Sequence, residues 1–97
     1  MHIYLIALFA RWCAPCHIEE PVLDQFQKDH PQVELHRYDV DQFSGAQIGQ
    51  RYGIRQIPSL LFIDSDSGRL LRVLIGVNTE ADIQDSLDQL SPAGPQQ

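Results

Sequence analysis

A short apolar run at residues 3–9, IYLIALF, constrains the fold of this chain most strongly. It is rich in strand-forming residues, and it lacks the alternation of polar and apolar side chains that marks a half-exposed strand. Such a run predicts a strand that is covered on both faces. We therefore expect residues 3–9 to form a central strand of a sheet.

The residues that follow predict a helix and a second strand. Apolar positions recur along one helical face of residues 14–28, at Ile18, Val22 and Phe26, with Leu23 beside them. Pro21 should kink this helix because it removes a backbone donor. Residues 33–40 predict the second strand, and the strand-helix-strand order predicts a parallel pair joined by a right-handed crossover.

The second half of the chain predicts four more elements. These are a weak helix at 44–51, a strand at 59–63, a DSDSG hairpin turn leading to a strand at 70–75, and a final helix that starts at a Thr79–Asp82 capping box. We expect one α/β domain over residues 1–91, with a four-stranded mixed sheet flanked by helices, and a disordered tail over residues 92–97.

Charge and hydropathy narrow the function. The 97 residues carry a net charge of −6, and the seven Lys and Arg residues are scattered, which argues against nucleic-acid binding. No stretch approaches the roughly 20 apolar residues of a membrane span. The apolar start has no basic segment before it, so we expect no export signal and a cytoplasmic protein. Structural disulfides are rare in that compartment, so paired cysteines there are more often metal-binding or redox-active.

The chemistry is expected at Trp12-Cys13-Ala14-Pro15-Cys16, where the first strand turns into the helix. A helix N-terminus directs unpaired N–H groups and partial positive charge at the Cys13 sulfur, which favours the thiolate. Cysteines in such places have pKa values of about 3.5 to 7.5, against about 8.5 for a free thiol. Cys16 lies one turn further on, so Cys13 is the expected nucleophile and Cys16 the resolving thiol. Pro15 stiffens the turn at little cost.

Three other interpretations of the two cysteines are open. They could be ordinary core residues. They could bind zinc, although a second C-x-x-C and an H-x3-5-H pair are missing. The letters Cys-Ala-Pro-Cys-His also match the attachment signature of c-type haem, with His17 as the axial ligand. Against haem, the only methionine is Met1, and the pattern is rich in strands.

Several ordered segments resemble the thioredoxin family over nearly the whole chain. They are FARWCAPC, the helix proline five residues after the second cysteine, YDVDQ, YGIRQIPSLLFI, and the two glycines Gly68 and Gly76. The resemblance implies that Pro58 is a cis-proline against the cysteine pair. It also implies a substrate groove formed by Trp12, Ile57, Pro58, Gly76 and Val77.

The chain departs from the family pattern in three ways, one of which is an insertion of about two residues near Ser44 to Gln47. The family's first strand and helix have no counterpart before Trp12. Ala7 also stands where the family carries a buried aspartate beneath the second cysteine, which puts proton transfer in doubt.

Two basic residues are candidates for tuning the thiol pKa. Arg37 alternates in phase with Val33 and Leu35, which allows it to point inward, but a solvent-facing side chain is the expected placement. His17 would add positive charge near the thiolate when protonated. We expect the neighbouring Glu19 and Glu20 to be solvated.

Together these features predict a thiol-disulfide oxidoreductase that reduces protein disulfides without a cofactor or metal. Its expected partners are disulfide-containing proteins and a thioredoxin reductase-type electron donor, and it is expected to be a monomer that binds no membrane. Two alternatives are an oxidant or isomerase of disulfides, since direction depends on potential, and a thioredoxin-like binding module with incidental cysteines.

Overall fold

The computed structural model describes residues 2–91, so the predicted disordered tail lies outside the described residues. Four strands and three helices follow one another in the order β1 (Ile3–Phe9), α1 (Ala14–Asp29), β2 (Leu35–Asp39), α2 (Phe43–Tyr52), β3 (Ser59–Asp64), β4 (Leu70–Ile75) and α3 (Glu80–Leu90). The predicted order of elements is confirmed. The boundaries shift by one or two residues, as expected where helix and strand ends are set by local hydrogen bonds.

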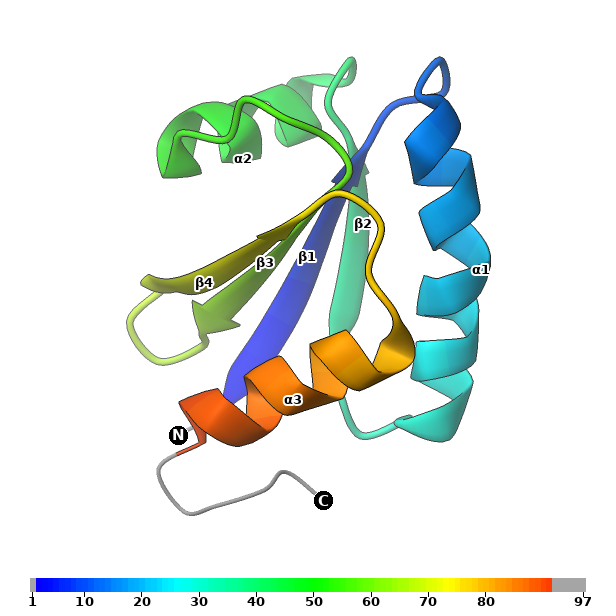
Figure 1. The fold of residues 1–97 in the computed structure, drawn as a ribbon. Coiled ribbons are helices and arrows are strands. Elements are labelled where there is room, and N and C mark those ends of the chain that lie inside the picture. Colours follow the sequence, from blue (N-terminus) through cyan, green and yellow to red (C-terminus); the bar gives the residue numbers. More distant parts are fainter. Residues whose placement is uncertain (1, 92–97) are drawn as a thin grey trace.

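The four strands form one mixed sheet in the order β2-β1-β3-β4 (Figure 1). β1 runs parallel to β2, with Ala7 opposite Arg37, and antiparallel to β3. β3 and β4 form the antiparallel hairpin predicted from DSDSG, and Gly68 in its turn has a φ of 74°. The parallel pair is joined through α1, which returns the chain across the sheet.

The sheet separates two apolar layers because alternate side chains of a strand point to opposite faces. On one face, α1 and α3 pack against the sheet through Leu23, Phe26, Ile83 and Leu87. On the other face, Ile48 and Tyr52 of α2 pack against a cluster that contains Ile6, Leu8, Leu61 and Ile63. Both faces of β1 are therefore covered, as its unbroken apolar sequence predicted.

The buried face of α1 differs from the predicted one. Its buried residues are Cys16, Glu19, Leu23 and Phe26, whereas Ile18 is 62% exposed. The expectation that Ile18 packs in the core is therefore wrong. Spacings of three and four residues both keep side chains on one helical face, and the docking of α1 on the sheet selects the set that starts at Cys16.

Candidate functional site

The two cysteines lie where β1 gives way to α1, and they form a disulfide bond. Cys13 is the N-cap residue of α1, and its sulfur accepts the backbone N–H of Cys16 over 3.3 Å. Pro15 lies in the first turn, where its missing N–H would have had no helical partner. The first helical turn contains no acidic residue, so its positive end faces the sulfur without a competing carboxylate.

Both cysteine residues are largely buried, at 4% and 6% exposed, and they share a small apolar cluster with Ala10. Ile57 packs against the same cluster. A dithiol in this place can be oxidised by thiol-disulfide exchange, which reduces another disulfide. The Cys13 sulfur is held at the helix end, and the Cys16 sulfur is already within bonding distance of it. The arrangement therefore supports reversible oxidation of the pair.

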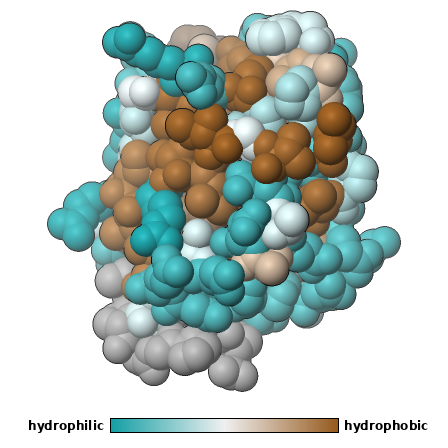
Figure 2. Space-filling view, viewed as in Figure 1, coloured by the Kyte–Doolittle hydropathy of each residue, from teal (hydrophilic) through white to brown (hydrophobic). Residues whose placement is uncertain are grey.

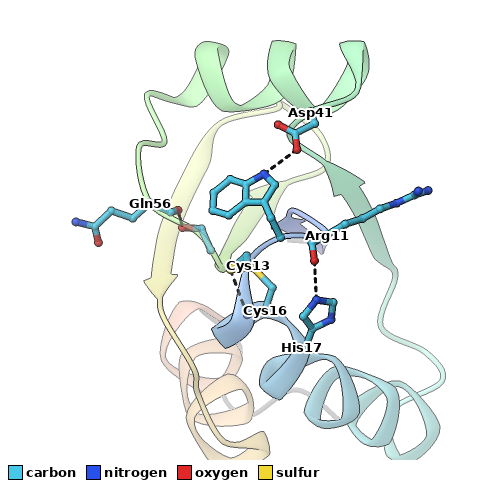
Figure 3. The surroundings of a disulfide bond; sticks show 8 residues. Arg11, Cys13, Cys16, His17, Asp41 and Gln56 are labelled. Carbon is cyan, nitrogen blue, oxygen red and sulfur yellow. Dashed lines mark hydrogen bonds between the residues drawn. A yellow bond between two sulfur atoms is a disulfide. The ribbon is translucent and has the colours of Figure 1, made fainter.

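Trp12 lies on the surface beside the disulfide, as the resemblance implied, and it is 70% exposed. Its indole Nε1–H donates to Oδ2 of Asp41 over 2.8 Å (Figure 3). Asp41 follows β2, and α2 approaches the same loop so closely that a Cβ on Gly45 would overlap the backbone carbonyl of Asp39. The contact between Trp12 and Asp41 could not be predicted from the sequence, because the two residues are 29 positions apart and no motif links them.

The second wall of the site is the segment before β3. The Ile57–Pro58 peptide bond is cis, as the resemblance implied. Gly76, with a φ of 84°, donates its N–H to the carbonyl of Pro58 over 2.8 Å. The resemblance placed both segments in one groove, and this bond holds the end of β4 beside the proline loop.

Several elements carry large apolar side chains that are exposed. Apart from Trp12 they include Ile18 on α1, Ile75 at the end of β4, and Val77 after it, at 62%, 58% and 47% exposed. Figure 2 shows apolar side chains gathered over the middle of one face of the molecule, above the polar surface of α3. An exposed apolar surface of this kind is typical of a site that receives another protein.

The two candidates for pKa tuning each have a partner other than the cysteines. The guanidinium of Arg37 donates to Asp24 on α1 over 2.7 Å, and its side chain is 31% exposed. Arg37 therefore takes the expected solvent-facing placement, because Asp24 supplies an acceptor at the surface. The Nε2 atom of His17 lies 2.7 Å from the carbonyl oxygen of Arg11 (Figure 3). Their influence on the thiols stays a prediction.

The expectation that Glu19 is solvated is wrong. Glu20 is exposed, as predicted, but Glu19 is only 3% exposed. Its Oε1 accepts the backbone N–H of Asn78 over 3.0 Å, which ties α1 to the loop before α3. Its sequence position offered one signal, since it lies three residues after Cys16 and four before Leu23, on the face that α1 buries.

Among residues 2–91, no group of three or more His, Cys, Asp or Glu side chains is placed to hold a metal ion. None of the helices within those residues is long and apolar enough to cross a membrane.

The fold and the disulfide together define a thiol-disulfide oxidoreductase of the α/β class. A sequence model of the thioredoxin family matches residues 1–89. The chain therefore belongs to the thioredoxin family.

Individual relatives support the same assignment. Over 79 residues the chain is 25% identical to thioredoxin-1 of Saccharomyces cerevisiae, and the aligned region covers 81% of this chain and 73% of that protein. Over 90 residues it is 30% identical to the chloroplastic M-type thioredoxin of Spinacia oleracea, covering 91% of this chain and 48% of the relative. The X-ray structure of Fasciola hepatica thioredoxin superimposes with a TM-score of 0.78 at 26% identity, covering 93% of this chain and 82% of that one.

Proposed function

We propose that this protein reduces disulfide bonds in other proteins through Cys13 and Cys16. The Cys13 thiolate attacks one sulfur of the substrate disulfide, which forms a mixed disulfide and releases the first substrate thiolate. Cys16 then loses its proton and attacks the Cys13 sulfur, which closes the internal disulfide and releases the second substrate thiolate. The dithiol loses two electrons, and the substrate gains them.

The observation that carries this proposal is the position of Cys13 as the N-cap of α1. The same N–H that contacts its sulfur in the disulfide would stabilise a thiolate in the reduced protein. Cys16 is held one turn further along the helix, where it reaches that sulfur. The two cysteines are chemically alike, so the position of each at the start of α1 is what would make Cys13 the nucleophile and Cys16 the resolving thiol.

The proposed partners are proteins with an accessible disulfide in an extended segment. Such a segment would lie along Ile57, Pro58 and the Gly76–Val77 strip, with its apolar side chains against Trp12. A thioredoxin reductase-type donor would return the two electrons to the oxidised pair. The protein would act as a monomer, since each copy carries both sulfurs and the groove.

The proposal is tested by reduction of insulin disulfides with dithiothreitol as the electron source. The unsubstituted protein should accelerate the loss of the inter-chain disulfides, and Cys13→Ser should reduce the rate to the background set by dithiothreitol. Cys16→Ser should accumulate a mixed disulfide at Cys13 that mass spectrometry detects. A protein that does not accelerate the reaction, yet still binds a disulfide-containing partner when Cys13 is serine, would instead be a binding module.

A further inference from the structure

A buried carboxyl group shares a cavity with the resolving cysteine. The cavity, of about 290 Å³, is open on one side, and it is lined by both Cys16 and Glu19. Residues three positions apart on a helix lie on the same face, with Cβ atoms about 5 to 6 Å apart. The lining from β1, from β3 and from the segment just before β3 is apolar or neutral, and it includes Ala7, Pro58, Ser59 and Leu60. Among the acids of α1 that line this cavity, Glu19 is the buried one, at 3% exposed.

The carboxyl group of Glu19 is easier to protonate than that of an ordinary glutamate, mainly because it is buried. Burial raises the pKa of Glu19 above its ordinary value of 4.5, the N–H of Asn78 opposes this shift, and the negative charge of Asp82 adds to it. Other charged or titratable groups line the same cavity from the loop before α1, from α1 and from β2: Arg11, His17, Glu20 and Arg37. Arg37 is paired with Asp24, so it does not neutralise Glu19.

We propose that Glu19 is the group that accepts the proton of Cys16 when Cys16 attacks the mixed disulfide. The cavity is large enough to hold water molecules that bridge the sulfur and the carboxylate, and the site has the polar groups that such water needs. Oε1 is engaged with Asn78, so Oε2 would take the proton. This inference rests on the proposed disulfide reduction and assigns a residue to its second step.

The proton balance of that step is complete. The Cys16 thiol gives its proton to the Glu19 carboxylate, and the resulting thiolate forms the bond to the Cys13 sulfur. The bond from Cys13 to the substrate sulfur breaks, and the substrate leaves as a thiolate. Glu19 then returns the proton to the departing thiolate or to solvent, so the carboxylate is restored.

Two substitutions of Glu19 separate proton transfer from a purely structural role. Gln at this position keeps the length of the side chain and a carbonyl oxygen that accepts the N–H of Asn78, but it cannot carry the proton. Asp keeps the carboxyl group on a shorter stem. Glu34, an exposed glutamate that does not line this cavity, supplies a control of equal charge.

The experiment is a stopped-flow reaction of the reduced protein with an excess of an aromatic disulfide whose released thiolate is coloured. Attack by Cys13 gives a first phase that depends on disulfide concentration, and resolution by Cys16 gives a second phase that does not. General acid–base groups contribute about 100-fold or more, and water can partly replace them, so we expect Glu19→Gln to slow the second phase by about tenfold. The first phase should be unchanged.

The pH profile and the controls decide the outcome. In the unsubstituted protein the second phase should rise with pH as Glu19 ionises, and Glu19→Gln should lose that rise while Glu19→Asp keeps it. Glu34→Gln should match the unsubstituted protein. An unchanged second phase in Glu19→Gln, an equal slowing of both phases, or an equal effect in Glu34→Gln would each overturn the inference. Absence of both phases in the unsubstituted protein would overturn the proposed function instead.

Discussion

The starts of α1 and α3 use the same physical device for different ends. At α3, the hydroxyl of Thr79 accepts the N–H of Asp82 over 3.1 Å, and the carboxylate of Asp82 accepts the N–H of Thr79 over 3.0 Å. At α1, the sulfur of Cys13 takes the position of the hydroxyl, and the first turn has no carboxylate to make the reciprocal hydrogen bond. The positive end of α3 is neutralised by its own side chains, with Glu80 adding a further charge, while that of α1 is left to act on a sulfur. One cap stabilises the fold, and the other holds the reactive group.

Substitution of Cys13 should have the largest effect of the changes considered for the two caps, and it should affect activity rather than stability. Serine is a strong N-cap residue, so Cys13→Ser should leave the free energy of unfolding of the reduced protein within about 0.5 kcal/mol of the unsubstituted value. Disulfide reduction should nevertheless fall to background, because the nucleophile is gone. Urea unfolding under reducing conditions and the insulin assay measure the two quantities. Substantial residual reduction would mean that the cap position does not define the reactive sulfur.

Thr79→Ala should show the opposite pattern. Loss of this cap should lower the free energy of unfolding by about 1 kcal/mol, because one backbone N–H loses its partner and the capping box is broken. For a domain of this size, that corresponds to a fall in Tm of roughly 5 °C. The rate of disulfide reduction at a temperature well below Tm should be unchanged, and Thr79→Ser should retain most of the stability. A large loss of activity in a folded Thr79→Ala protein would contradict the division between the two caps.

A carboxylate in the first turn of α1 should make the two caps more alike. Helix termini interact with nearby charges by about 0.3 to 1 kcal/mol, so Ala14→Asp should raise the pKa of the Cys13 thiol by roughly 0.5 unit. The rate of alkylation by iodoacetamide, followed against pH, measures this shift. Ala14→Asn provides a control of the same shape without the charge. An unshifted profile in Ala14→Asp would show that the helix end does not set thiol reactivity.

The smallest expected effect is a pH dependence of stability at Glu19. Burial raises the pKa of this group in the folded protein, so the folded state binds the proton more tightly than the unfolded state. Stability should therefore be fully present below pH 4.5 and should decline as pH rises from there through the raised pKa. Urea unfolding of the oxidised protein at a series of pH values should show this decline. It should be smaller in Glu19→Gln, and a decline equal in both proteins would assign it to other groups.

Much of the fold follows from the sequence, because each element carries a local signal. The apolar run of β1, the hairpin turn before Gly68 and the capping box at Thr79 each depend on residues close together in the chain. The spacing of Cys13 and Cys16 likewise places both sulfurs at one helix end before any tertiary contact is known.

The features that sequence analysis missed depend on contacts between distant segments. The docking of α1 on the sheet buries Glu19 and exposes Ile18, and it brings Asn78, 59 positions away, to the carboxylate. The partner of Trp12 is likewise supplied by a loop that only the packing of β2 and α2 brings near. Patterns within one helix cannot decide between such neighbouring faces.

The proposed activity requires a reversible redox equilibrium between the dithiol and the disulfide of Cys13 and Cys16, and this equilibrium can be measured. The protein would be equilibrated in dithiothreitol or glutathione buffers of graded potential, and its free thiols would be counted by alkylation and mass spectrometry. We predict a single reversible transition between a dithiol and an intramolecular disulfide, with a midpoint nearer the roughly −270 mV of thioredoxin than the roughly −120 mV of a strong oxidant. A midpoint near the latter value would reverse the proposed direction, and a pair that forms no disulfide at any potential would contradict the account as a whole.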